Sequence, residues 1–364
     1  MRSLLLIAFT VAWCATASGE TADFRFGYLS ETATNIQGGD RQLWRYADQW
    51  TFAATIDLQE LLGIEQAVFA VTLTDRNGRS LSRDAGLGSL QQVQEIYGRG
   101  QTWRWTQFSY QQQYFDGRLD WKIGRLVGGE DFADFSCEFM NLTFCGPPPG
   151  NIAVGYWYNW PVSQWATRLR ANFKGLGYVQ LGAYEVDPDN LLTKNGMDLG
   201  DSGGASGVLV PLEAAWQPVF RSTLDGSYKV GAWYNTSSSA GVAEHYGAYI
   251  NFLQRLTAPT SERGVRVFLN ATFADRRSAL THQIATGVFY TGPFDLRAND
   301  EVGFAIGSTH ARTLGSECVS EIFYALRAAS WLELRPNVQY VHQPGGLARK
   351  RGHVIAGVRV SFNL

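Results

Sequence analysis

The stretch Val354-Ile355-Ala356-Gly357-Val358-Arg359-Val360-Ser361-Phe362-Asn363-Leu364 ends the sequence and decides the fold. Apart from Ile355, its large apolar side chains all fall at even positions, and the odd positions are mostly small or polar. Successive side chains of a strand point to opposite faces, so the stretch predicts an amphipathic strand. Such a strand suits both a closed membrane barrel and a soluble sandwich with one buried face.

The same two-residue period recurs along the chain. It is clearest in residues 49–58, 178–185, 245–254, 264–273 and 321–327. Asn-Gly and Asp-Gly pairs favour hairpin turns, as at residues 75–78, and alternate with long loops such as 80–102 and 193–209. Residues 90–97 are expected to form a short helix within the first of these loops. Outer-membrane barrels show this asymmetry of short turns and long loops. At about 20 residues per strand and connector, the chain predicts an all-β transmembrane antiparallel barrel of about 16 strands.

The N-terminal residues predict export. Arg2 precedes an apolar run at residues 4–15, and Ala15-Thr16-Ala17 matches a signal-peptidase cleavage pattern. We therefore expect residues 1–17 to be a signal peptide and residues 18–364 to form one barrel domain. No later segment has the 18 or more apolar residues expected of a spanning helix.

Composition narrows the function classes. The formal charge of −2 gives no indication of nucleic-acid binding. Many aromatic residues (12 Trp, 16 Tyr and 21 Phe) with only 18% charged residues suit strands that are apolar on one face. The spacing of Cys137 and Cys145 favours a local disulfide in an exported protein, with free thiols as the alternative; Cys318 is left over. Nothing suggests a metal or another cofactor, and we expect none.

Several segments, taken in order, resemble the carbohydrate-selective porin family of the OprB type. They comprise Gly38-Gly39-Asp40 leading into residues 50–58 and Leu62-Gly63; Lys122-Ile123-Gly124-Arg125 followed by Glu130-Asp131-Phe132-Ala133; residues 139–144; and the C-terminal strand. The resemblance spans residues 24–364. It departs from the family at Leu364, where such barrels commonly end in Phe, and in the Cys137/Cys145 pair with its Gly-Pro-Pro-Pro-Gly sequence at 146–150.

The resemblance implies a 16-stranded bacterial outer-membrane channel with an inward-folded constriction loop. It implies passive, sugar-favouring diffusion of small carbohydrates such as glucose, with outer-membrane lipid and sugars as partners. Monomer and homotrimer both stay open. A porin makes and breaks no bonds, so we expect no enzymatic activity.

Strand phase predicts which charged side chains face the channel, because charge on the lipid side costs roughly 2–4 kcal/mol near the bilayer midplane. Ordinary water-facing polarity is the alternative for each of them. The set is Asp57, Lys122, Arg168, Arg170, Arg266, Arg327, Glu333, Arg335 and Arg359.

Two further groups are candidates for contacts with sugar. Glu130, Asp131, Asp134, Glu138 and Asn141 lie at a strand end and in the proposed inward loop, with an ordinary solvated loop as the alternative. We expect the carboxylates of Glu130, Asp131 and Glu138 to lie across the narrowest section from arginines, chiefly Arg168, Arg170, Arg266 and Arg335. An aromatic-rich group is interpreted either as sugar-stacking platforms or as the interfacial girdle: Trp103, Trp105, Trp157, Tyr158, Trp160 and Trp165.

Three rival functions remain. A general diffusion porin would share every barrel feature and differ only at the constriction. An outer-membrane enzyme such as a lipase would need a Ser–His pair on the lipid face, and the sequence names no such pair; it contains no HExxH. A secreted carbohydrate-acting β-protein would be recovered in a soluble fraction.

Overall fold

The computed structural model describes residues 21–200, 203–237, 245–258 and 263–364. The expected signal peptide, 1–17, lies outside these residues. No helix among the described residues is long and apolar enough to cross a membrane.

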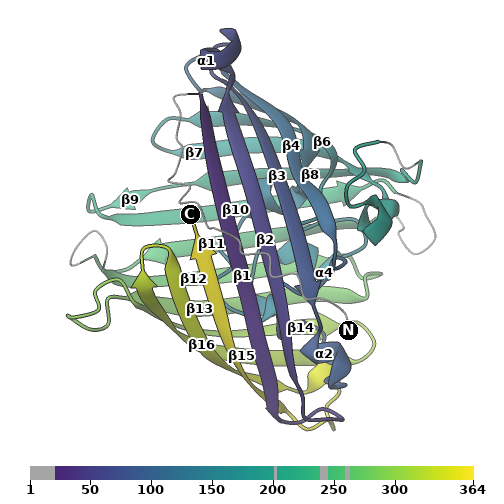
Figure 1. The fold of residues 1–364 in the computed structure, drawn as a ribbon. Helices are drawn as coiled ribbons and strands as arrows, with labels where there is room; N and C mark the ends of the chain where they lie inside the picture. Colours follow the sequence, from purple (N-terminus) through teal and green to yellow (C-terminus); the bar gives the residue numbers. More distant parts are fainter. Residues whose placement is uncertain (1–20, 201–202, 238–244, 259–262) are drawn as a thin grey trace, which may run out of the picture.

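The strands of the described chain form one antiparallel sheet that closes on itself (Figure 1). β1 pairs with β2 on one side and with β17 on the other, so the sheet has no free edge at this seam. Its strands are β1 (Ala22–Gln37), β2 (Trp44–Asp57), β3 (Ala67–Gly78), β4 (Trp103–Tyr114), β5 (Leu119–Leu126), β6 (Gln164–Phe173), β7 (Gly177–Val186), β8 (Gly207–Trp216), β9 (Val219–Phe220), β10 (Leu224–Asn235), β11 (His245–Arg255), β12 (Gly264–Ala274), β13 (Leu280–Thr291), β14 (Glu301–Ala311), β15 (Gly315–Ala329), β16 (Leu332–His342) and β17 (His353–Asn363).

β9 has two residues and pairs only with the start of β10, so 16 full strands make the wall. This confirms the predicted fold class and strand number. Every strand candidate from the sequence overlaps an observed strand. Residues 75–78, which we read as a turn, instead complete β3, and residues 90–97, expected to form a short helix, contain none.

The two ends of the barrel differ in their connections. One, the long-loop end, carries residues 79–102, 127–163, 187–200 and 203–206; the opposite short-turn end carries 115–118, 174–176 and 330–331. Small helices lie in the connections: α1 (Leu58–Leu62) at the short-turn end, and α2 (Leu81–Asp84), α3 (Gly128–Asp131), α4 (Pro148–Ile152), η1 (Leu142–Phe144), η2 (Pro188–Leu191), η3 (Thr193–Asn195) and η4 (Pro344–Gly346) at the long-loop end. Figure 1 shows α1 and α2 at opposite ends of the barrel.

The barrel interior is filled in part by its own connections. Phe139, Met140 and Phe144 of the β5–β6 connection pack with Phe268, Phe289 and Phe323 of the wall in one buried cluster. Gly307 of β14 permits close approach, because a Cβ there would lie only 2.9 Å from the Phe144 ring. The connection between β5 and β6 therefore runs along the inner wall.

The outer face is apolar, as lipid requires. On β17, Val358 is exposed on the outer row, whereas Arg359 is buried and Ser361 lines an internal cavity. The alternation read from residues 354–364 thus assigns the two rows correctly.

This assignment predicts a difference between two arginine substitutions on one strand. Val358→Arg places a charge on the lipid side and should destabilise the barrel by about 2–4 kcal/mol near the midplane. Ser361→Arg should change stability little, because the new side chain reaches water inside the barrel. Equilibrium denaturant unfolding in lipid vesicles measures both, and equal losses would contradict the assigned faces.

Candidate functional site

Buried carboxylates on the wall fasten the inward segments through backbone N–H groups. Glu321 of β15 accepts hydrogen bonds from the Met140 and Asn141 amides, both at 2.8 Å. Glu317, four residues earlier on the same face of β15, accepts from the Leu90 and Gln91 amides at 2.7 and 3.2 Å. Because a carboxylate has two acceptor oxygens, each glutamate can hold two successive amides and so fix the path of a loop.

A second set of contacts joins both long connections to the β1–β17 seam. Arg359 of β17 pairs with Glu31 of β1 at 2.6 Å and with Glu95 of the β3–β4 connection at 3.1 Å. The same guanidinium donates to the Phe139 carbonyl oxygen at 2.9 Å. One buried arginine therefore connects the barrel seam to two loops that are distant in sequence.

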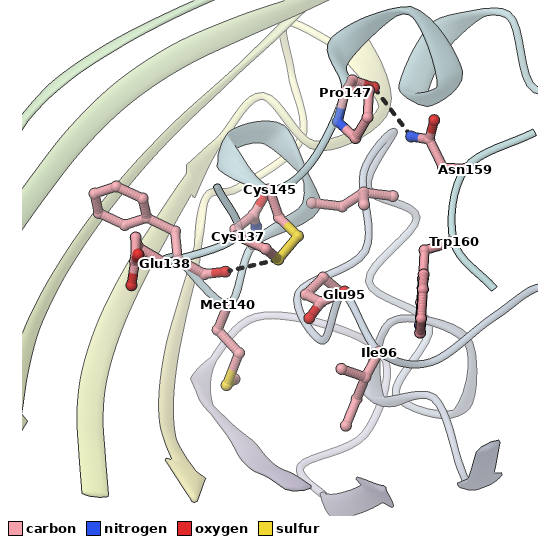
Figure 2. Close-up of a disulfide and its surroundings, with 12 residues drawn as sticks. Glu95, Ile96, Cys137, Glu138, Met140, Cys145, Pro147, Asn159 and Trp160 are labelled. Carbon is pink, nitrogen blue, oxygen red and sulfur yellow. Dashed lines mark hydrogen bonds between the residues drawn. A yellow bond between two sulfur atoms is a disulfide. The ribbon is translucent and has the colours of Figure 1, made fainter. Parts of the chain in front are cut away.

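Cys137 and Cys145 are joined by a disulfide in the β5–β6 connection. Figure 2 shows Glu95, Ile96 and Trp160 on one side of this bridge. The ligand atoms of Glu95 and the two cysteines lie within 4.8 Å of one another, but bonded sulfurs are not thiolates, so these three residues do not make a metal site. Cys318 is a free thiol on β15.

Three cavities lie inside the barrel. The outer cavity, about 580 Å³, opens among the long loops, and the inner cavity, about 780 Å³, lies at the short-turn end. These two share five lining residues: Leu29, Gln49, Glu130, Cys137 and Trp160. A side cavity of about 480 Å³ adjoins the short-turn end and is also lined by Glu130.

Gln49 orients two of the groups around this junction. Its side-chain oxygen accepts from Arg76 Nε at 2.8 Å and from Trp160 Nε1 at 3.1 Å. An indole nitrogen has a single N–H, so this bond fixes the ring's orientation beside the cavities. The guanidinium of Arg76 is held at the same point, on the outer-cavity side.

Glu130 and Glu138 lie in one connection but have opposite electrostatic environments. The Glu130 side chain is exposed to the cavities and forms no hydrogen bond or ion pair with the described residues. Surrounding protein, with Asp134 and Asp131 nearby, raises its pKa to about 7. Burial opposes ionisation of Glu138 too, but Arg335 at 2.7 Å, with Arg266 and Arg359, holds its pKa below the ordinary value.

The structure brings part of the predicted arginine–carboxylate arrangement together. Arg335 faces Glu138 and also Glu333, at 2.6 Å, beside the inner cavity. Asp131 pairs with Lys122 at 3.0 Å and lies 3.9 Å from Arg168.

Other predicted partners differ. Arg266 pairs with Glu301 at 2.7 Å, and Arg170 donates to Gln180 at 2.8 Å while stacking on Tyr178; both arginines line the side cavity. Asp134 pairs with Lys229 at 3.6 Å, and Arg327 with Glu333 at 3.5 Å.

Four predicted site residues have structural roles instead. Asp57 caps α1 at the short-turn end by accepting from the amides of Gln59 and Glu60, because its strand ends there. Arg168 is almost fully buried against Asp120 at 2.7 Å. Asn141 is buried at the loop–wall contact, where it donates to Gln339. Trp157 lies in a buried aromatic cluster and therefore belongs neither to a girdle nor to a cavity lining.

The other tryptophans divide between two environments. Trp103 and Trp165 are exposed on the outer surface near the long-loop end, where girdle residues lie. Trp105 packs beside Phe108 on the same outer face. Trp160 lines both the outer and the inner cavity. Tyr158 is buried.

Among the polar residues of the outer cavity that sequence reasoning missed are Gln49, Arg76, Glu95 and Arg99. Arg76 lies in the segment interpreted as a turn, and Glu95 and Arg99 lie in a connection without periodic signal. The carbonyl oxygens of Gly150 and Val154 accept from Arg99, and burial lowers the pKa of that guanidinium to about 10, so it stays charged at neutral pH. The available clue to these cavity residues was the charged pair Glu95 and Arg99, four residues apart in a long loop.

A closed barrel with an apolar outer face and a polar, partly filled interior defines the class: an outer-membrane porin. The chain matches the model of the carbohydrate-selective porin OprB family over residues 41–364. The chain belongs to this family and is an outer-membrane channel for sugars.

Individual relatives agree. The chain is 37% identical over 393 residues to Porin B of Pseudomonas aeruginosa, covering 93% of this chain and 86% of that protein. It is 32% identical to the putative porin QuiX of Acinetobacter baylyi, with 93% and 88% covered. The high-pH structure of Pseudomonas putida OprB, 36% identical, superposes with a TM-score of 0.91 over 95% of this chain and 94% of that one.

The anchoring role of Glu321 gives a prediction. Glu321→Gln preserves the side chain's shape but leaves one acceptor oxygen for two amides. Charge-assisted hydrogen bonds are worth about 1.5–3 kcal/mol, so exchange of the Met140 and Asn141 amides should accelerate roughly tenfold or more. Hydrogen–deuterium exchange of the detergent-solubilised barrel measures this.

Glu333→Gln is the matched control, because its carboxylate accepts from arginine side chains and not from these amides. Unchanged exchange in Glu321→Gln, or equal acceleration in both variants, would show that Glu321 does not hold the loop.

Proposed function

We propose that this channel favours small neutral sugars such as glucose, and that its selective section is the junction of the outer and inner cavities. The observation that supports the proposal is the set of groups at this junction. Trp160 offers an apolar ring, while Gln49, Arg76 and Glu130 offer hydrogen-bond donors and acceptors. A sugar combines apolar C–H faces with hydroxyls and matches both kinds of group.

Charge balance favours neutral solutes. The outer cavity is lined by two guanidinium groups, Arg76 and Arg99, and two carboxylates, Glu95 and Glu130. Opposed charges attract hydroxyl dipoles from either side, whereas a solute of either charge meets one repelling pair. Open cavities on both sides let a weakly bound solute leave, as conduction requires.

The inner cavity continues this pattern toward the short-turn end. Arg335, Glu138 and Glu333 form one mutually paired cluster there. Their charges are largely compensated, so we assign them to shaping the exit rather than to choosing the solute.

The proposal treats each chain as a complete pore, because one chain closes its own sheet; association into trimers would not alter the path. It also treats the chain as a channel and not as an enzyme, in line with its relatives, which are porins. The expected signal peptide, 1–17, belongs to this proposal, since an outer-membrane protein must be exported.

Liposome swelling with a solute panel tests the sugar preference. Glucose should enter several times faster than amino acids of equal size. Trp160→Ala should reduce this ratio, because the apolar face for sugar C–H groups is lost, whereas Trp165→Ala, on the outer surface, should leave it unchanged. Equal rates for all solutes of one size would instead favour a general diffusion porin.

The pKa of Glu130 gives a second test. The surrounding protein, with Asp134 and Asp131 nearby, raises the pKa of its carboxyl to about 7, so the carboxyl goes from mostly neutral to mostly ionised as pH rises from about 6 to 8. The junction therefore gains negative charge as pH rises, and reversal potentials should shift toward cation preference between about pH 6 and 8.

Glu130→Gln should remove this shift. Glu138→Gln is the control, because the pKa of Glu138 is held low and its carboxyl is already ionised across this range. Loss of this carboxylate should shift the reversal potential by a similar amount at every pH and leave its pH dependence in place. A pH dependence that persists in Glu130→Gln would place the titrating group elsewhere.

A further inference from the structure

Basic residues gather on one side of the long-loop end. Three turns there, residues 275–279, 312–314 and 343–352, connect β12 to β13, β14 to β15 and β16 to β17. Strands lie about 4.8 Å apart, so successive turns of this set are separated by roughly 10 Å. We call them the basic rim; its basic side chains are Arg276, Arg277, Arg312, Arg349, Lys350 and Arg351.

Most of these charges are uncompensated. Arg276, Arg312, Arg349 and Arg351 are exposed and form no side-chain hydrogen bond or ion pair with the described part of the chain. The basic rim contains one acidic residue, Asp275, which is buried and paired with His245 and with Arg277. By contrast, Arg79 and Arg83 of the β3–β4 connection pair with Asp84 at 2.8 and 3.4 Å.

The outward-facing side chains of β13 and β14 indicate where the basic rim lies relative to the bilayer. Ile284 of β13 and Ile306 of β14 are exposed on the outer, lipid-facing row. Toward the turns, the same row changes to His282 and His310, whose rings stack at 4.8 Å. His282 lies two residues from Ile284, and His310 lies four residues from Ile306, so the change from apolar to polar takes about 7–14 Å along the strands. The turns beyond this change carry the arginines, which places them at headgroup level.

Hydrogen bonds keep these imidazoles in polar surroundings. His310 Nδ1 lies 2.9 Å from Ser316 Oγ, and His282 Nδ1 lies 3.2 Å from Thr281 Oγ1. The outer row at this height is therefore able to meet polar headgroup atoms, and the turns that carry Arg276 and Arg312 continue directly from these two strands.

We propose that the basic rim binds phosphate groups of lipid in the outer leaflet of the outer membrane. Guanidinium groups match phosphate oxygens in a two-pronged geometry. Unpaired arginines about 10 Å apart at headgroup level suit a lipid with more than one phosphate. The site lies outside the barrel and is independent of the sugar path.

Binding of a bisphosphorylated lipid A to the detergent-solubilised barrel tests this proposal, with native mass spectrometry as the readout. The triple variant Arg276→Gln, Arg312→Gln and Arg349→Gln should bind at least tenfold more weakly than the unmodified chain. Binding should also fall when the probe is dephosphorylated, and when salt is raised.

A matched control removes three exposed positive charges from the short-turn end: Arg118→Gln, Lys174→Gln and Arg221→Gln. This control should retain lipid A binding, and both variants should retain glucose uptake in liposome swelling, which shows that the barrel is folded. The proposal is overturned if the two triple variants lose binding equally, if dephosphorylated lipid A binds as well, or if millimolar inorganic phosphate alone displaces the lipid.

Discussion

Closure of the backbone hydrogen-bond ladder between β1 and β17 is the constraint on which the rest of the structure depends. Lipid offers no partners for an open strand edge, so a sheet in a bilayer must return to its first strand. Here β17, the last strand of the chain, pairs with β1 and β16, which leaves neither of its edges open. Closure in turn creates an enclosed interior that the chain fills with its own connections.

The interior is held by charge, at the same seam that closes the barrel. Arg359 of β17 reaches Glu31 of β1 and Glu95 of the β3–β4 connection, so barrel closure and loop placement share one ion-pair cluster. Removing one partner of such a buried cluster leaves an uncompensated charge, which costs more than the pair contributes. Correct closure of the wall and correct placement of the loops are therefore coupled, and a misregistered seam would also misplace the channel lining.

Local patterns could predict the wall but not the lining. The two-residue period assigns Trp50 and Phe52 of β2 to the outer face, where both are exposed. This assignment needs only local sequence, because successive side chains along a strand alternate between its two faces. Trp157 and Trp160 show the limit: three residues apart in one loop, one is buried in a core and the other lines two cavities. Their environments depend on the path of the loop through the barrel, which contacts distant in sequence decide.

The same reason explains the carboxylates. Glu130 and Glu138 are eight residues apart and read alike as acidic loop residues, yet only Glu138 meets an arginine, Arg335 of β16. That meeting follows from the Glu321 contacts with Met140 and Asn141, which bring the segment against β15 and β16. Glu130, farther back along the connection, faces open space between the cavities instead. A wall glutamate that contacts no solute thus determines which loop carboxylate is neutralised and which is left free at the junction.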